Sequence, residues 1–373
     1  MKRLAIFVAT SGHSGVDRNM KNLIPEIAAH NIQVDVLRIR NHGLYLEQEV
    51  SKLPDNVRIV ELNAAHVNTS LLPLLRYLVK ERPHAMLTDK DKVNRLALWA
   101  RWLAHVPTRL AIRIGTTVSK NLENRSAVQR WAQYTSIRLF YHWADAIITP
   151  SRGAAEDLAQ IARLPVERIS VIPSPVITKR FCKLMAQPVE HPWFTHKDRP
   201  VVLGVGELSK RKDFATLLRA FARLRKQRPA RLIILGEGRQ RIPLEQLATE
   251  LGIRDDLHLA GFTPNPYAFM ARADLFVLSS TCEGAPVALI EALGVGVPAI
   301  STDCPSGPAE ILDGGRVGPL VPVGDHTALA EAMRQMLDEP PNPSRLQAAV
   351  RPYRSEVSAV RYLQALGLEP LER

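Results

Sequence analysis

Residues 273–302 read ADLFVLSSTCEGAPVALIEALGVGVPAIST and contain the pattern that decides the fold. Two short apolar runs, Leu275–Leu278 and Pro298–Ser301, flank a helix-like segment, Pro286–Leu293. A helix between two buried strands predicts a βαβ unit with parallel strands. Pro286 favours a helix start at this point, because proline fits the first helical turn, where its missing N–H is not needed.

The same alternation of apolar runs and longer amphipathic segments continues along the chain. The other expected strands are Leu4–Thr10, Val34–Arg38, Val57–Leu62, Ala85–Thr88, Arg109–Ile114, Ala146–Thr149, Ile169–Ile172, Val201–Val205, Leu232–Leu235 and Leu257–Ala260. The other expected helices are Asp17–His30, Leu71–Arg82, Lys92–Ala104, Ala127–Trp143, Gly153–Ile161, Phe214–Arg228, Leu244–Leu251, Tyr267–Arg272 and Thr327–Leu337. This order predicts an α/β fold of two tandem, Rossmann-like, doubly wound domains. Ligands bind at the carboxyl ends of strands in such sheets, so we expect the site in an interdomain cleft.

The length of 373 residues suits two domains of similar size. We expect an N-terminal domain over 1–175 and a C-terminal domain over 201–350. The stretch 176–200 is expected to be a linker, because prolines interrupt its periodicity. A C-terminal helix is expected within 351–373, with packing back onto the N-terminal domain as one option.

Charge is concentrated in the first half of the chain. Residues 1–180 contain 26 Lys and Arg against 15 Asp and Glu, which accounts for +11 of the formal net charge of +12. Such a field attracts anionic surfaces or phosphorylated molecules, although basic residues can also simply solvate a surface. Three cysteines form neither a CxxC pair nor a metal-ligand spacing, so we expect reduced thiols in a cytoplasmic protein. No apolar stretch is long enough to cross a bilayer.

Two loops carry residues suited to binding phosphate. In the first, Glu283, Gly284, Ala285, Pro286 and Val287 lead into a helix that also contains Glu291. The free N–H groups of a helix start can hold a diphosphate, and small residues let a ligand approach the backbone. The two glutamates lie about 7–8 Å apart along the helix axis, so they can bind hydroxyls at two places on one ligand. The alternative is an ordinary helix with an acidic start.

In the second loop, residues 206–214 read GELSKRKDF and follow the strand Val201–Val205. Fixed cations after a buried strand fit anion binding, and a solvated charge run is the alternative. The first loop of the chain, residues 11–15, also contains glycines but lacks the GxGxxG dinucleotide fingerprint. The second strand ends in Arg38 rather than in a ribose-binding acid, which disfavours a dehydrogenase.

These stretches resemble the retaining, nucleotide-sugar-dependent glycosyltransferases of family 4, the group 1 glycosyltransferases, which adopt the GT-B fold. The similar segments are GVDRNMKNL from Gly15, ADAIITPSRGAAEDL from Ala144, RISVIPSPV from Arg168, VGELSKRKDFATLLRAFA from Val205, LIILGEGRQR from Leu232, LHLAGF from Leu257 and ADLFVLSSTCEGAPVALIEALGVGVPAISTDCPSGPAEIL from Ala273. The resemblance covers almost the whole second domain and patches of the first.

The resemblance implies a donor site in the second domain and an acceptor-binding first domain. It implies that Glu283 faces the sugar and that Lys212 contacts the diphosphate, which makes these two the candidate catalytic residues. It further implies that Glu291 binds the ribose hydroxyls, that Gly261 and Phe262 border the nucleobase, and that the loop at Gly15 approaches the phosphate or the acceptor. The family's chemistry uses no metal and no cofactor besides its nucleotide-sugar substrate.

Two departures from the family pattern concern individual residues. Glu207 stands where the family usually has arginine, so we expect Lys210 or Arg211 to replace that cation. The family often supplies a His or Glu after the fifth strand, where this chain has Arg113. We therefore take Arg113 and His13 as candidates for the acceptor side.

Aromatic and basic residues recur at helical spacing in the first half. They include Trp131, Tyr134, Arg138, Tyr141 and His142, together with Trp99, Arg101 and Trp102. Such stripes are usually packing residues, and the alternative is a face for peripheral binding to a membrane.

We predict a glycosyltransferase that moves a hexose or N-acetylhexosamine from a nucleotide sugar, with UDP favoured. The expected acceptor is an anionic or phosphorylated saccharide, a lipid-linked glycan or a lipopolysaccharide core, at the inner face of the cytoplasmic membrane. A nucleotide-sugar 2-epimerase of the same fold is an alternative, as is a non-catalytic nucleotide or nucleic-acid binder. No motif or aromatic platform supports nucleic acid as a partner.

Overall fold

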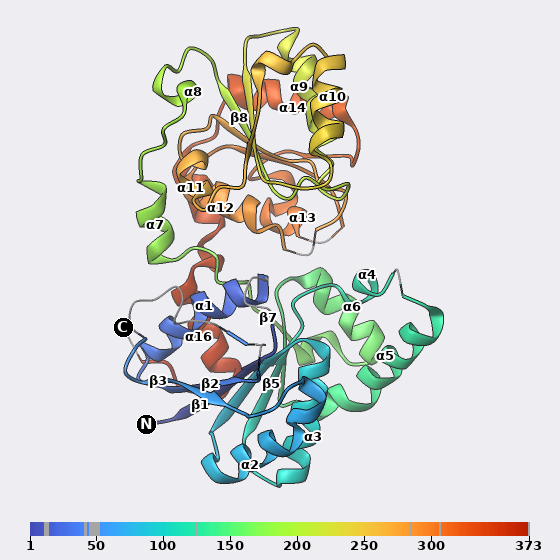
Figure 1. Cartoon of the computed structure of the whole chain (residues 1–373), viewed down its shortest axis with the longest axis vertical. Helices are drawn as coiled ribbons and strands as arrows, with labels where there is room; N and C mark the ends of the chain where they lie inside the picture. The colour runs from blue at the N-terminus through green and yellow to red at the C-terminus, as the bar shows by residue number, and fades with distance from the viewer. Residues whose placement is uncertain are drawn as a thin grey trace. The chain divides into compact units, whose positions relative to one another are not determined.

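The computed structural model describes residues 1–10, 15–40, 43–44, 53–123, 125–283, 285–305 and 307–371. The chain forms two compact units (Figure 1). Unit 1 contains Met1–Pro175 together with Arg354–Arg373, and unit 2 contains Val176–Tyr353. Segments from near the two ends of the chain lie close together within unit 1, where Lys2 Nζ is 3.6 Å from Glu369 Oε2.

Unit 1 is built on a seven-stranded parallel sheet in the order β3-β2-β1-β4-β5-β6-β7. The strands are β1 (Arg3–Val8), β2 (Gln33–Arg38), β3 (Val57–Glu61), β4 (Ala85–Asp89), β5 (Arg109–Arg113), β6 (Ala146–Thr149) and β7 (Ile169–Val171). The helices are α1 (Gly15–Ala28), α2 (Leu71–Glu81), α3 (Asp91–Ala104), α4 (Val118–Asn121), α5 (Ala127–Phe140), α6 (Arg152–Ala162) and α16 (Ser355–Ala365).

Alternating strand residues of unit 1 feed two apolar cores, because successive side chains of a strand point to opposite faces. Ala5 and Phe7 of β1 belong to the core that includes residues of α2, α3, α5 and α6. Leu4 and Ile6 belong to the other core, with α1 and the C-terminal helix α16. Helices therefore cover both faces, as parallel sheets require.

Unit 2 repeats this plan on a six-stranded parallel sheet in the order β10-β9-β8-β11-β12-β13. The strands are β8 (Val201–Val205), β9 (Arg231–Leu235), β10 (Leu257–Gly261), β11 (Leu275–Leu278), β12 (Ala299–Thr302) and β13 (Leu320–Val321). The helices are α7 (Lys179–Met185), α8 (Pro192–Thr195), α9 (Phe214–Arg225), α10 (Arg241–Glu250), α11 (Pro266–Met270), α12 (Val287–Val295), α13 (Pro308–Ile311), α14 (His326–Asp338) and α15 (Pro343–Ala349). The α/β fold with two Rossmann-like sheets is thereby confirmed.

Two predicted boundaries differ from the structure. Residues 176–200, expected to be a linker, belong to unit 2, because Val176, Ile177 and Phe181 are buried in one of its cores. The helix expected over Ala127–Trp143 ends at Phe140, and a 3₁₀ turn follows. Proline spacing alone did not reveal the apolar contacts that bring 176–200 into the unit.

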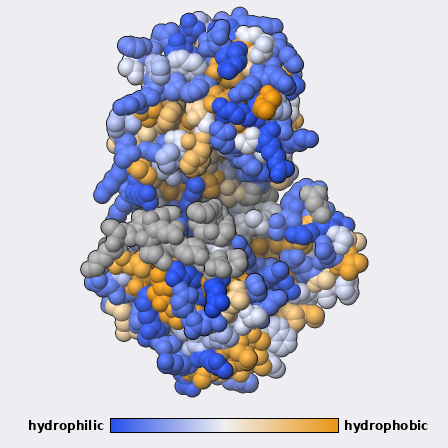
Figure 2. All heavy atoms as spheres, in the orientation of Figure 1, coloured by the Kyte–Doolittle hydropathy of each residue, from blue (hydrophilic) through white to orange (hydrophobic). Residues whose placement is uncertain are grey.

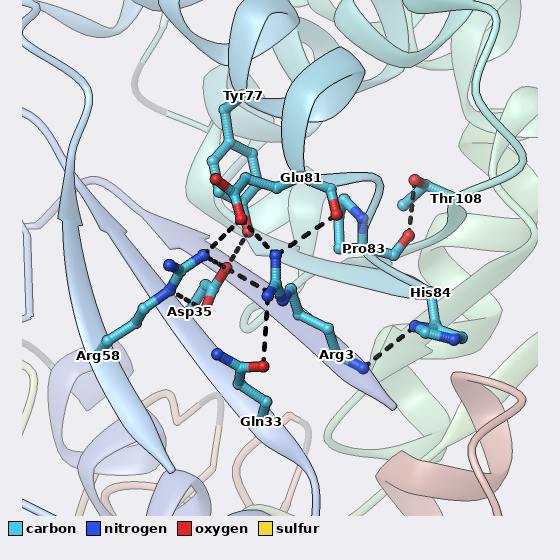
Figure 3. A network of polar contacts seen from close by, with 9 residues as sticks. All are labelled: Arg3, Gln33, Asp35, Arg58, Tyr77, Glu81, Pro83, His84 and Thr108. Carbon is cyan, nitrogen blue, oxygen red and sulfur yellow. Dashed lines mark hydrogen bonds and ion pairs between the residues drawn. The ribbon is translucent and has the colours of Figure 1, made fainter. Parts of the chain in front are cut away.

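A buried polar network holds α2 against the edge of the first sheet (Figure 3). Asp35 of β2 is fully buried, and Arg58 of β3 donates to its two carboxylate oxygens at 2.7 and 2.8 Å. Tyr77 of α2 donates its hydroxyl to Asp35 at 2.6 Å, and Arg58 also reaches Glu81 at 2.7 Å. Arg3 pairs with Glu81 as well. A buried carboxylate needs such partners, because an unpaired charge in the core is strongly destabilising.

Candidate active site

Two loops of unit 2 meet at the carboxyl ends of neighbouring strands. Residues 206–213 connect β8 to α9, and residues 279–286 connect β11 to α12. The loops are joined through the backbone of the first: Thr281 N donates to Arg211 O at 2.8 Å, and Ser279 Oγ donates to Lys212 O at 2.9 Å. Pairing of β8 with β11 therefore brings together residues that are about 70 positions apart in the sequence.

The centre of the site is an ion pair between Lys212 and Glu283. Lys212 Nζ lies 2.5 Å from Glu283 Oε1, and their side chains are 11% and 7% exposed. Arg211 Nη1 lies 3.1 Å from the other carboxylate oxygen, and Ser280 Oγ donates to Oε1 at 2.7 Å. Two cations therefore face one carboxylate and leave a local excess of positive charge. A diphosphate entering here would meet fixed cations, which form strong, short hydrogen bonds with phosphate oxygens.

Glycines allow these loops to pack closely. A Cβ on Gly236 would lie 1.9 Å from the carbonyl oxygen of Gly206, and a Cβ on Gly206 would lie 2.9 Å from Lys212 Cε. Only glycine fits where backbone approaches backbone at this distance. The aliphatic part of Lys212 therefore lies across Gly206, and this contact helps to direct its ammonium group towards Glu283.

The helix expected to bind phosphate begins directly after the second loop. Pro286 caps α12, and Val287 is its first residue. Glu291 lies in the middle of this helix and is buried. Ala285 is partly exposed, whereas Gly284 lies outside the described residues. The amino end of α12 thus follows Glu283 by a few residues, and its N–H groups add a partial positive charge to the site.

The predicted nucleobase border lies at the end of β10. Gly261 has φ of +79°, and its carbonyl accepts a hydrogen bond from Gly236 N at 2.8 Å. The next residue, Phe262, is 78% exposed, which is high for a phenylalanine. Its ring is open to a stacking partner. Glu207 is also exposed, and Arg211 is the neighbouring cation that contacts Glu283.

Sequence reasoning did not single out Ser209. Its hydroxyl oxygen is buried and has no hydrogen-bond partner among the described residues, although it lies in the same loop as Lys212. Buried polar atoms are normally paired, so the unpaired hydroxyl of Ser209 is a candidate contact for a ligand. The sequence places a serine beside the basic cluster, and only the structure shows that its hydroxyl lacks a partner.

Three residues of unit 1 were predicted to lie near the donor phosphate or the acceptor: Gly15, His13 and Arg113. Gly15 is the first residue of α1, and His13 lies outside the described residues. Arg113, the other candidate for the acceptor side, has its side chain turned into unit 1, where it is 1% exposed and forms an ion pair with Asp89. Its guanidinium also donates to Tyr362 Oη at 2.9 Å and to Ser174 Oγ at 3.3 Å. All of its nitrogens are thereby used inside unit 1.

Comparison with known families identifies the class of this protein. The model described as glycosyl transferases group 1 matches residues 190–352, and the model described as a glycosyl transferase 4-like domain matches residues 14–175. The chain belongs to the group 1 glycosyltransferase family and is a glycosyltransferase with a GT-B fold. The resemblance seen in its motifs is confirmed.

Individual relatives and solved structures agree with this assignment. An N-acetylgalactosaminyltransferase of Campylobacter jejuni, which acts on N-acetylgalactosamine-N,N'-diacetylbacillosaminyl-diphospho-undecaprenol, is 29% identical over 91% of this chain and 91% of its own length. The lipopolysaccharide core glycosyltransferase LpsE of Rhizobium meliloti is 29% identical over 67% of this chain and 72% of its own. Anabaena HepE in complex with UDP has a TM-score of 0.75 and 18% identity, with 98% and 100% of the two chains covered.

Proposed function

We propose that this glycosyltransferase moves a hexose or N-acetylhexosamine from a UDP-sugar to an anionic or phosphorylated acceptor in envelope glycan synthesis. The observation that carries the proposal is the pairing of Lys212 and Arg211 with Glu283 where the two loops meet. This arrangement provides cations for a diphosphate and a carboxylate for sugar hydroxyls within a few ångströms of one another. HepE, which shares the fold, is a UDP-glucose complex in one structure, and this supports UDP as the carrier.

In this proposal Lys212 stabilises the leaving diphosphate, because negative charge develops on it as the glycosidic bond breaks. Fixed donors placed where charge develops are worth the most in catalysis. Arg211 supplies the cation expected at Glu207, and the amino end of α12 adds its dipole. Glu283 faces the sugar, Glu291 binds the ribose, and the ring of Phe262 stacks on the base. The leaving phosphate accepts the acceptor's proton on the same face of the sugar, so the anomeric configuration is retained.

Thermal stabilisation by nucleotides tests the donor site directly. We expect UDP to raise the melting temperature of the full chain in the presence of EDTA, because a ligand that binds only the folded state stabilises it by mass action. Lys212→Met should remove most of this shift. Lys226→Met is the matched control, since Lys226 is exposed at the far end of α9 and has no ion pair among the described residues. No shift with UDP, GDP or ADP would overturn the proposal.

The acceptor class rests on the charge of unit 1. Its residues include 27 Lys and Arg against 18 Asp and Glu, a net charge of +9. The Campylobacter relative acts on a diphospho-undecaprenol glycan, and LpsE acts in lipopolysaccharide core synthesis. UDP release that depends on an added acceptor would support transfer. Release of a free epimerised sugar without an acceptor would instead indicate the 2-epimerase reaction.

An exposed apolar stripe on α5 supports binding to a membrane surface. Val128, Trp131 and Leu139 recur with the spacing of one helical face, and Trp131 is 68% exposed. Residues 127–143 contain two arginines, Arg130 and Arg138, and no carboxylate. Figure 2 shows hydrophobic side chains along the margin of unit 1 where α5 lies. Apolar, aromatic and arginine side chains on one helix are typical of helices that lie in the headgroup region.

The end of α5 continues into an aromatic cluster on α3. The ring centroid of Trp99 lies 5.3 Å from that of Phe140, 5.5 Å from Trp143 and 5.7 Å from Trp102. Trp102 is itself exposed. Not every residue of the predicted stripe faces outward: Tyr141 is buried and donates to Asp91 at 2.9 Å. The exposed face therefore includes fewer residues than the sequence spacing predicted, and Trp131 lies at its centre.

Co-sedimentation with vesicles tests this surface. We expect binding to vesicles that contain phosphatidylglycerol, and weaker binding to vesicles of phosphatidylcholine alone, because arginines attract anionic headgroups. The double variant Trp131→Glu with Leu139→Glu should lose most of the binding. Ile242→Glu, at an exposed position on α10 of unit 2, is the matched control. Equal binding by both variants would contradict the assignment of this surface. Among the described residues, no helix has the length and apolarity to span a bilayer.

A further inference from the structure

Unit 1 contains a cavity of about 550 Å³ that the donor site does not use. It opens at the carboxyl ends of β4 and β5, where ligands bind in doubly wound sheets. Its volume is within the range of small-molecule sites. A second hollow of about 400 Å³ shares five of its lining residues: Lys92, Arg95, Asn121, Arg125 and Gln133. The two hollows are therefore adjacent, and both are lined by residues of α3 and α5.

The charges of this cavity do not balance. Both carboxylates that line the cavity already have ion-pair partners, since Asp89 pairs with Arg113 and Asp91 pairs with Arg95 at 2.7 Å. Lys90, Lys92 and Arg125 also line it, and none of them has an ion-pair partner among the described residues. Three cations from two different segments therefore surround a space that lacks a compensating anion.

Two local features show that this space is more than a solvated surface. Arg95 Nε is buried and has no hydrogen-bond partner among the described residues. Lys90 has φ of +75°, a conformation that costs a residue with a Cβ about 1–3 kcal/mol and persists only where the surroundings enforce it. A hydrogen bond from Lys90 N to Asp89 Oδ1 at 2.7 Å holds the lysine in this position. Such strain is concentrated at functional sites.

Much of the remaining wall of the cavity is apolar. This part is formed by Val16, Val67, Val93, Ile114, Val118 and Ile137. A ligand that satisfies the whole cavity must therefore combine a phosphoester anion with a less polar part, such as the face of a sugar ring or the start of a lipid chain. A free inorganic ion would leave the apolar wall without contacts.

We propose that this cavity binds the phosphoester group of the acceptor through Lys90, Lys92 and Arg125. The proposal rests on the proposed transferase function, because it assigns the phosphate to the acceptor rather than to the donor. The donor's diphosphate has its own cations in unit 2, so the two sites can be tested separately.

Lysine acetylation read by mass spectrometry locates binding at individual residues. The full chain is saturated with UDP, which occupies the donor site, and is then labelled with or without inorganic pyrophosphate. We expect pyrophosphate to slow the labelling of Lys90 and Lys92 and to leave Lys80 unchanged, because Lys80 is exposed on α2 outside the cavity. A parallel arm uses vesicles that contain phosphatidylglycerol, so that a lipid headgroup can be distinguished from a glycan phosphate.

Variants decide between a built site and a general basic surface. Lys92→Gln with Arg125→Gln should weaken pyrophosphate binding by at least about tenfold, since each removes a charge-assisted hydrogen bond. Lys80→Gln should not change it, and stabilisation by UDP should persist in both variants. Protection by pyrophosphate supports a site for the acceptor's phosphate, and protection by vesicles alone supports a site for a bilayer headgroup. If neither protects Lys90 and Lys92 while UDP still binds, the cavity proposal is overturned and the donor site stands.

Discussion

Replacement of Arg113 by methionine should destabilise unit 1 strongly. The guanidinium is buried against Asp89, Tyr362 and Ser174. Methionine fills a similar volume but carries no charge and no donor. Asp89 would remain in the core with only the backbone N–H of Lys90 as a described partner. Tyr362 would also lose the contact that ties α16 to the end of β5.

The size of the effect follows from what is left unpaired. Removing one partner of a buried ion pair costs about 3–5 kcal/mol, because the other charge stays in the core without compensation. For a unit of this size, each kcal/mol lowers the melting temperature by roughly 2–4 °C, so a fall of roughly 6–20 °C is expected. Adding Asp89→Asn to Arg113→Met should recover about half of the loss, since the orphaned charge is then removed.

Tryptophan fluorescence during urea denaturation measures this loss, because Trp99, Trp102, Trp131 and Trp143 all lie in unit 1. The matched control is Arg109→Met. Arg109 donates to Ala365 O at 3.1 Å from an exposed position, so its loss should cost less than about 1 kcal/mol. A cost for Arg113→Met below about 1 kcal/mol, or a double variant no more stable than the single one, would refute the argument that Arg113 is a structural cation.

Two further predictions concern other parts of the structure. Gly236→Ala should cost about 1–3 kcal/mol of stability and weaken UDP binding, because its Cβ would collide with Gly206 O and displace the loop 206–213. Unchanged stability and unchanged UDP binding in a thermal shift assay would contradict this prediction. A hydrogen bond from Arg58 lowers the pKa of Glu81 in the folded protein. The Glu81 carboxylate should therefore stabilise the fold fully at pH values above its unfolded pKa of about 4.3. This stabilisation should be lost as the pH falls through the lower pKa of the folded state. Glu81→Gln should therefore reduce the difference in the free energy of unfolding between pH 7 and pH 3, measured by urea titration. The same difference in the variant and in the original protein would argue against this role of Glu81.

Most of the fold could be predicted from the sequence because its signals are local. Most of the predicted strands in the two sheets are short apolar runs, and burial on both faces makes such runs easy to recognise. The two-residue strand β13 was missed because two residues cannot show a period. Residues 176–200 were misassigned because prolines hide the apolar contacts of Phe181, which are made with residues far along the chain.

The candidate site was predictable only in part, because sequence signals are local whereas the contacts of the site join residues far apart in the chain. Strand ends and motif resemblance indicated Lys212 and Glu283, but their contact joins residues 71 positions apart. Arg113 is the last residue of β5, where a ligand-binding residue could also lie, and its partner Tyr362 is 249 positions away. Local pattern therefore identifies which residues stand at the functional edge of a sheet. It does not tell whether such a side chain faces a ligand or a buried partner.

The two proposals for unit 1 converge on α5, although different residues carry them. Gln133 and Ile137 line the cavity, whereas Val128, Trp131 and Leu139 form the exposed stripe. At 100° per residue, Ile137 lies on the side of the helix opposite to this stripe. A helix about 10–12 Å in diameter would thus separate a lipid surface from a cation-lined cavity.

That separation suits an acceptor whose phosphate follows directly on a lipid chain, because the chain can stay in the bilayer while the phosphate reaches Lys92 and Arg125. A water-soluble acceptor would need the cavity but not the stripe. Transfer to such an acceptor should therefore survive Trp131→Glu with Leu139→Glu, whereas transfer to a lipid-linked one should not.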